Sequence, residues 1–131
     1  MKRDEHLIVD GMDVHFTDSG TGTIVLLLHG WSDTLSTFDA LISALGEKRF
    51  VAIDLPGFGG SEHPITSWDV SHYAEFVRNF LDKLHIDQPD ILVGHSFGGR
   101  VAIKSIANQT LKPNKLVLIA SAGVAVRNTT R

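Results

Sequence analysis

The stretch Ile91–Arg100 reads ILVGHSFGGR, a short apolar run that leads into a serine between glycines. The apolar residues before it predict a buried strand over Pro89–Val93. The spacing of apolar residues after it predicts a helix over Phe97–Asn108. Ser96 therefore stands at a sharp corner between a strand and a helix, where a Cβ on a neighbouring residue would collide with the packed elements.

The pattern G-x-S-x-G at a strand-to-helix corner is typical of a nucleophile elbow. Such a corner exposes the serine hydroxyl, and the N-terminus of the following helix favours negative charge beside it. The backbone N–H of Phe97 is then placed to stabilise an oxyanion. The pattern also occurs by chance, and the alternative is a glycine-rich turn that merely allows close packing. Its position between a strand and a helix favours the nucleophile.

The rest of the chain predicts an α/β fold. A hairpin is expected over His6–Asp18 with its turn at Asp10-Gly11, followed by alternating strands and helices. This alternation predicts a mostly parallel sheet with helices on both faces, a three-layer αβα sandwich within one domain, residues 1–131. Ser67 or Asp69 is placed to cap the second helix. The strands are expected over Thr23–His29, Phe50–Asp54, Pro89–Val93 and Lys115–Ala120, and the helices over Leu35–Leu45, Val70–Leu84 and Phe97–Asn108.

Composition excludes several classes of function. The formal net charge of −3 gives no support for nucleic acid or an anionic membrane as a partner. The chain has no cysteine, and its histidines show no metal-ligand spacing. Ser19–Gly22 lacks the third glycine of a dinucleotide fingerprint, and no P-loop lysine follows Gly57–Ser61, so no cofactor is expected. Without an apolar signal segment or membrane span, a cytoplasmic location is expected.

Three motifs follow three successive predicted strands: His29-Gly30-Trp31, Asp54–Ser61 (DLPGFGGS) and Gly94–Gly99 (GHSFGG). In this order they resemble the N-terminal half of the α/β-hydrolase fold, and the resemblance covers nearly the whole chain. It implies an incomplete α/β-hydrolase fold that runs from the hairpin through the sixth strand. The segments that would carry the lid, the catalytic acid and the catalytic histidine are absent.

The resemblance also implies roles for individual residues. Ser96 matches the nucleophile, and Trp31 and Phe97 match the positions whose backbone N–H groups form the oxyanion hole. The residues expected to support the loop and the elbow are His29, Gly30, Gly94, His95 and Gly98.

Other residues near the motifs have more ordinary interpretations. His29 is expected to support its turn rather than to act as base, and His95 to pack away from the serine hydroxyl. Asp54 is interpreted as a loop-stabilising carboxylate rather than a triad acid. Trp31 and Phe58 either line an acyl pocket or are simply loop aromatics. His6, His15, His63, His72 and His85 are expected to be surface or hairpin histidines.

The base is missing from the sequence. All 15 Asp and Glu residues and all 7 histidines precede Ser96, whereas the family order is Ser, then Asp or Glu, then His. A serine hydroxyl is a poor nucleophile without an adjacent, oriented base. We therefore expect the chain alone to be inactive and a second chain or a C-terminal segment to complete it. The apolar sixth strand is expected to form an open edge and to leave the isolated chain marginally stable.

These observations predict a serine hydrolase that cleaves small carboxylic esters through an acyl-enzyme on Ser96. Carbon–carbon bond hydrolysis, cofactor-free perhydrolysis, amide hydrolysis and acyl transfer would use the same residues. Epoxide hydrolases and dehalogenases are disfavoured, because those families carry Asp at the nucleophile position. The alternative from another class is a non-catalytic protein on the hydrolase scaffold, or a complementing half of a heteromer.

Overall fold

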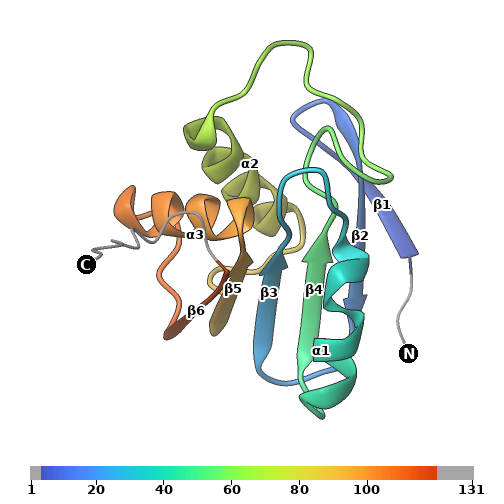
Figure 1. Ribbon diagram of the computed structural model, residues 1–131, viewed down its shortest axis with the longest axis vertical. Helices are drawn as coiled ribbons and strands as arrows, with labels where there is room; N and C mark the ends of the chain where they lie inside the picture. Colours follow the sequence, from blue (N-terminus) through green and yellow to red (C-terminus); the bar gives the residue numbers. More distant parts are fainter. Residues whose placement is uncertain (1–3, 121–131) are drawn as a thin grey trace, which may run out of the picture.

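The computed structural model describes residues 4–120 and contains a mixed sheet flanked by helices (Figure 1). Each expected strand and helix is present, with boundaries that differ by a few residues. In chain order the elements are β1 (Asp4–Val9), β2 (Met12–Ser19), β3 (Ile24–Leu28), the 3-10 helix η1 (Leu35–Phe38), α1 (Asp39–Ala44), β4 (Arg49–Ile53), α2 (Val70–Lys83), β5 (Ile91–His95), α3 (Phe97–Ala107) and β6 (Lys115–Ile119).

The six strands lie in the order β1-β2-β4-β3-β5-β6. β1 and β2 form the expected antiparallel hairpin, and β2 also pairs antiparallel with β4. The remaining neighbours are parallel, with Leu28 opposite Ile53 on one side and Gly94 on the other. This register brings the carboxyl ends of β3, β4 and β5 to one edge, where open α/β sheets place their ligands.

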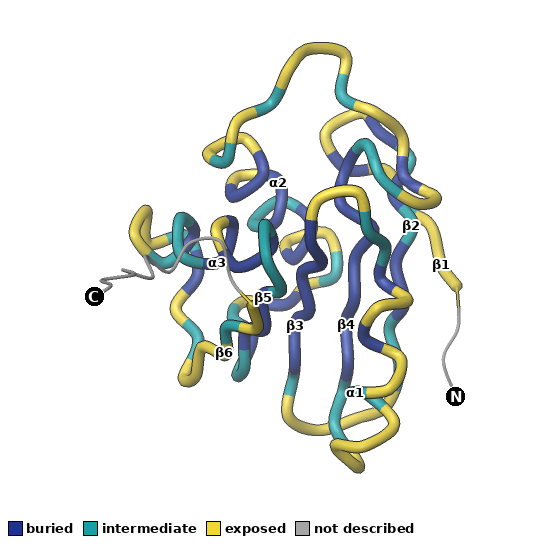
Figure 2. Tube along the Cα trace, in the orientation of Figure 1, coloured by how far each residue is buried: buried dark blue, intermediate teal, exposed yellow. Residues whose placement is uncertain are grey.

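Helices cover both faces of the sheet, which confirms the three-layer prediction. Successive residues of β3 point to opposite sides, so that Leu26 and Leu28 pack toward α2 and α3 while Val25 and Leu27 pack toward η1. The larger core lies on the α2 and α3 side. Figure 2 shows β3 and β4 buried along almost their whole length, as expected for strands covered on both faces.

Helix α2 begins at a capping box in which the Asp69 carboxylate accepts the backbone N–H of His72, and the His72 side chain accepts that of Asp69. Of the two expected caps, Asp69 is therefore the one used. The spacing of apolar residues predicts one buried stripe on this helix, made of Val70, Tyr73, Ala74, Val77, Phe80, Leu81 and Leu84. This stripe omits Phe76, which is fully buried. The buried face is wider than one stripe, because α2 packs against both the sheet and α3.

Two other boundaries differ from expectation. The predicted strand over Pro89–Val93 instead runs from Ile91 to His95. Asp90 lies outside the strand, and its carboxylate accepts the backbone N–H of Ile24 at 2.8 Å. The segment predicted as one helix over Leu35–Leu45 begins with a 3-10 turn, capped by the Thr34 side chain, before α1.

Candidate functional site

Ser96 occupies the corner between β5 and α3 with φ 54° and ψ −118°. A non-glycine residue in this region is strained, typically by about 1–3 kcal/mol. The surrounding bonds hold the conformation: the Ser96 N–H donates to the Ile119 carbonyl at 3.0 Å, and the Ser96 carbonyl accepts the Gly99 N–H at 2.9 Å. The strained corner expected at this serine is therefore present.

The glycines around Ser96 are required by close backbone approach. A Cβ on Gly98 would overlap the carbonyl oxygen of Leu28, and a Cβ on Gly94 would lie 2.5 Å from Cα of Gly99. Both contacts are with backbone atoms, which cannot rotate away. The helix therefore sits directly against β3 and β5, and its first turn lies at the carboxyl edge of the sheet.

The loop after β3 approaches the same corner. A Cβ on Gly30 would lie 3.1 Å from Cβ of Ser96, so any side chain there would press on the serine. The Gly30 carbonyl accepts the N–H of Asp33 at 3.2 Å, and Ser32 has φ 60°, which together close a tight turn around Trp31. Trp31 is thus held beside Ser96 although 65 positions separate them in sequence.

His29 fixes the start of this turn. Its Nε2 accepts the backbone N–H of Leu55 at 2.9 Å, which leaves the ring proton on Nδ1, where it donates to the Gly30 carbonyl at 2.7 Å. The ring is fully buried, and this burial lowers the pKa of His29 below its ordinary value, an effect that the bond to Gly30 partly offsets. Both ring nitrogens are engaged, so His29 has no lone pair available to take a proton from Ser96.

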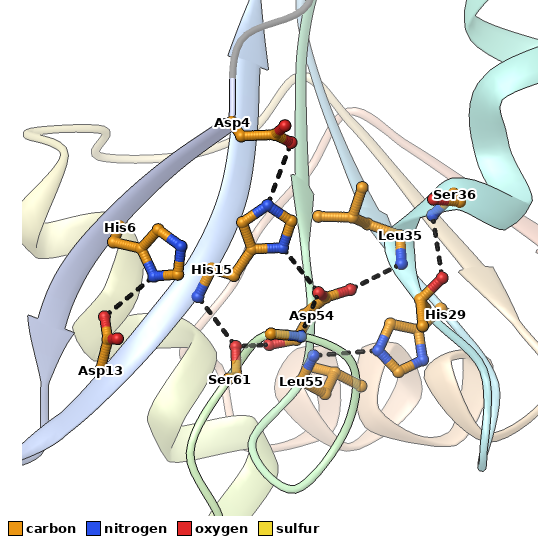
Figure 3. Close-up of polar contacts among 12 residues, drawn as sticks. Asp4, His6, Asp13, His15, His29, Leu35, Ser36, Asp54, Leu55 and Ser61 are labelled. Atoms are coloured by element: carbon orange, nitrogen blue, oxygen red, sulfur yellow. Dashed lines mark hydrogen bonds and ion pairs between the residues drawn. The ribbon is translucent and has the colours of Figure 1, made fainter.

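Asp54 is buried at the end of β4 and accepts three hydrogen bonds (Figure 3). Oδ1 accepts the Leu35 N–H at 2.8 Å, and Oδ2 accepts the Gly60 N–H at 2.9 Å and His15 Nδ1 at 2.7 Å. Its backbone carbonyl accepts the Ser61 hydroxyl at 2.6 Å. Asp54 thereby ties together two loops and the hairpin, which is the geometry of a loop-stabilising carboxylate.

The Asp54–His15 pair does not replace the missing acid and base. His15 lies on β2, which is separated from β5 by β4 and β3. Three steps of about 4.8 Å place the two strands about 14 Å apart. This distance is far beyond the hydrogen-bond reach that a base needs.

His95 precedes Ser96 and differs from His29 in its partners. Its Nδ1 is buried and makes no hydrogen bond to any described residue. A Cβ on Gly30 would lie 3.3 Å from this nitrogen, so the ring borders the Trp31 turn. His95 is consequently the unsatisfied polar group of the elbow.

Aromatic rings surround the Trp31 turn. The exposed indole of Trp31 contacts Phe58 at 4.8 Å and Phe97 at 5.2 Å between ring centroids, both edge to face. Phe97 in turn meets Tyr73 at 5.4 Å, and Tyr73 meets Trp68 at 5.1 Å. These contacts are the favoured geometry for aromatic pairs.

All of these rings except Phe97 line a groove of about 380 Å³ that reaches Trp31. Trp31 and Phe58, which the sequence singled out, line it together with Trp68, Tyr73 and Pro64. Sequence reasoning missed Trp68 and Tyr73. The available signal was their position on either side of the start of α2, directly after the loop that carries Phe58.

The described residues hold neither a metal cluster nor a membrane-spanning helix. Within residues 4–120, no group of three or more His, Asp or Glu side chains is arranged to hold a metal ion. None of the helices in this range is both long enough and apolar enough to cross a membrane. The expected site residues instead gather at one edge, since His29, Gly30 and Trp31 follow β3 while Gly94, His95, Ser96, Phe97 and Gly98 follow or end β5.

Comparison with known proteins agrees with this geometry. The model of the Alpha/beta hydrolase family matches residues 25–130. A soluble epoxide hydrolase of Corynebacterium sp. is 35% identical over 96 residues, which are 72% of this chain and 33% of that protein. A 2-hydroxymuconate semialdehyde hydrolase of Pseudomonas sp. is 32% identical over 127 residues, which are 91% of this chain and 44% of the relative.

A solved structure gives the same result at the level of the fold. The crystal structure of a membrane phospholipase A, a bacterial virulence factor, superposes with a TM-score of 0.88 at 31% identity. The match covers 95% of this chain and 41% of the phospholipase. The chain thus spans less than half the length of each of these three proteins.

Proposed function

Since the chain belongs to the alpha/beta hydrolase family, we propose that it is the N-terminal part of a serine hydrolase with Ser96 as its nucleophile. The strained corner at Ser96, with the Trp31 turn packed against it, carries this proposal. A serine held at φ 54° on a strand-to-helix corner presents its hydroxyl at the carboxyl edge of the sheet.

In the proposed reaction, Ser96 Oγ attacks the carbonyl carbon of an ester while a base takes the hydroxyl proton. The tetrahedral intermediate collapses, the alcohol leaves with a proton, and an acyl-enzyme remains on Ser96. Water then attacks the acyl group, which releases the acid and restores the hydroxyl.

The backbone N–H groups of Trp31 and Phe97 are the proposed oxyanion donors. Neither donates a hydrogen bond to any group within residues 4–120. Phe97 is the first residue of α3. At a helix N-terminus the backbone N–H groups have no helical partner, and the helix dipole places a partial positive charge there. Two unused donors beside one hydroxyl are what an oxyanion hole needs.

We infer that residues outside this sequence supply the acid and the histidine. Both nitrogens of His29 are engaged, and His15 lies several strands from Ser96. After Ser96 the sequence has no Asp, Glu or His. On this proposal, the 131-residue chain alone hydrolyses esters no faster than its Ser96→Ala variant.

The aromatic groove supports an uncharged substrate with an apolar or aromatic group. Trp31 links the groove to the corner, since its side chain forms a wall and its backbone N–H belongs to the proposed oxyanion hole. A small carboxylic ester with an aromatic substituent fits such walls. Ester cleavage remains the first candidate on these grounds.

The relatives suggest two other reactions. The second candidate is hydrolysis of a semialdehyde, which the name of the Pseudomonas relative states. Carbon–carbon bond hydrolysis in this family would use the same serine. Epoxide opening, suggested by the name of the Corynebacterium relative, is the third candidate, because the family resemblance implies Asp at the nucleophile position of epoxide hydrolases, where this chain has Ser96.

Labelling with a fluorophosphonate tests the nucleophile directly. The native gene product and the 131-residue chain are treated in parallel, together with Ser96→Ala. Ser36→Ala is the matched control, because Ser36 is an exposed serine outside the elbow. Rapid labelling of the native gene product that disappears only in Ser96→Ala supports the proposal. Absence of labelling in the native gene product refutes it and favours a non-catalytic scaffold protein.

A further inference from the structure

A polar network joins His15 of the N-terminal hairpin to Leu35 through Asp54 (Figure 3). Its centre is Asp54, which is 2% exposed and accepts the N–H of Leu35, four residues after Trp31. The same carboxylate accepts hydrogen bonds from the N–H of Gly60 and from Nδ1 of His15. His15 is thus connected to the proposed oxyanion hole through one carboxylate, although it does not touch the hole.

We propose that His15 is a positioning residue whose protonated ring fixes the Asp54 carboxylate and so holds the Trp31 turn in place. The inference rests on the proposed function through the role given to the Trp31 N–H. It goes beyond that function, because it assigns a task to a histidine of the hairpin.

The hydrogen bonds determine which nitrogens of His15 carry protons. Nδ1 must donate, because a carboxylate that already accepts two N–H groups has no proton to offer in return. Nε2 lies 3.1 Å from Oδ1 of Asp4 on β1, so a proton there is also stabilised. The doubly protonated ring therefore bridges two carboxylates, one buried and one exposed.

The charges around His15 favour this form. Burial lowers the pKa of His15, but the hydrogen bonds and charges of Asp54 and Asp4 outweigh it and raise the pKa above the ordinary value of 6.5. The other titratable ring facing it is His6 on β1, at 5.1 Å between centroids, and His6 is itself bonded to Asp13. The pair thus stabilises the fold fully below pH 6.5 and loses this contribution as pH rises through the raised pKa.

Loss of His15 removes the cation but leaves the buried carboxylate. Below its raised pKa, the wild-type His15 ring gives Asp54 a charge-assisted hydrogen bond, which a variant without the imidazole cannot make. The difference between such a variant and the wild type is greatest in acid, where the wild-type pair that fixes the acceptor of the Leu35 N–H is complete. The defect should therefore depend on pH, whereas a simple packing defect would not.

The experiment measures the rate of fluorophosphonate labelling of the native gene product from pH 5 to pH 8. The variants are His15→Leu, which removes both donor and charge, and His15→Asn, which keeps a donor without charge. His85→Asn is the matched control, because His85 is exposed and its φ of 60° suits Asn. Each rate is divided by the wild-type rate at the same pH, so that titration of the catalytic base cancels.

The ratio for His15→Leu should be highest at pH 8 and fall about tenfold toward pH 5, because the charge-assisted hydrogen bond of the protonated wild-type ring is about twice as strong as a neutral one. His15→Asn should show the same acid loss with a smaller loss at pH 8, and His85→Asn should give a constant ratio. Circular dichroism at each pH checks that the variants are folded, and His15→Asn serves if His15→Leu does not fold.

A ratio for both His15 variants that does not change with pH would overturn the inference, even if the rates were low. That outcome differs from failure of the proposed function, in which the wild type itself shows no labelling that depends on Ser96. A ratio that falls toward pH 8 instead of pH 5 would also contradict the proposed role.

Discussion

In the loops after β3 and β4 the buried polar side chains are hydrogen-bonded, whereas the region around β5 and β6 has a buried polar atom without a partner in residues 4–120 and exposed apolar side chains. Around β3 and β4, both nitrogens of His29 are paired and the Asp54 carboxylate accepts three bonds. Around β5 and β6, Nδ1 of His95 is buried without a partner among the described residues. Leu116, Val117 and Ile119 of β6 are 37–42% exposed.

This difference separates two parts of the proposed active site. The turn that carries Trp31 is held entirely by residues of this chain, so its geometry is prepared before any substrate or base arrives. β6 lies beside Ser96, whose N–H donates to the Ile119 carbonyl, but its other edge is open, since within residues 4–120 β6 pairs with β5 alone. An apolar edge of this kind invites pairing with another strand. Three variants test this contrast.

The largest effect is expected for Asp54→Leu, which leaves the N–H groups of Leu35 and Gly60 and the ring of His15 without their acceptor. Removing one partner of a buried ionic network costs about 3–5 kcal/mol of unfolding free energy. Urea unfolding followed by circular dichroism measures the change. Asp82→Asn is the control, because its exposed pair with Arg78 should contribute at most about 1 kcal/mol. Equal losses in the two variants would show that the Asp54 network is not an anchor.

An intermediate effect is expected for Val117→Lys on β6. The change should benefit the 131-residue chain and harm the native gene product. In the 131-residue chain this side chain is 42% exposed, so a charge there should raise the soluble fraction by discouraging edge pairing. If residues outside this sequence cover β6, the same change should destabilise the native gene product by about 2 kcal/mol. Ile65→Lys is the control, since Ile65 is fully exposed in a loop. Sedimentation measures the soluble fraction, and urea unfolding measures the stability, of both proteins. If Val117→Lys changes neither quantity in either protein, the interpretation of β6 as an open edge is wrong.

The smallest effect is expected for Ser96→Gly, which relieves the strain at φ 54°. Glycine adopts this conformation without a Cβ penalty, so the variant should be more stable than Ser96→Ala by about 1 kcal/mol. Both variants lose the hydroxyl, so the difference between them measures the free-energy cost of holding a residue with a Cβ in this backbone conformation. Thermal unfolding of the two variants side by side measures it. A Ser96→Gly less stable than Ser96→Ala would mean that the corner stores no strain.

Patterns local in the chain predicted the fold well. The alternation of apolar strands and amphipathic helices gave the layers, and Asp10-Gly11 gave the hairpin turn. Phe76 was missed because a single stripe was assumed for a helix that packs on two sides. The exact limits of β5 were missed because they depend on Asp90, whose partner Ile24 is 66 residues away.

The sequence by itself determined the order of the elements and the corner at Ser96, because backbone propensities and glycine placement act over a few residues. It also determined that no acid or histidine follows Ser96. Only the tertiary structure decided that His29 is fully engaged, that Asp54 anchors the Trp31 turn through Leu35, and that His15 belongs to this network. The physical reason is that hydrogen bonds between distant segments depend on strand order and register, which no local pattern encodes.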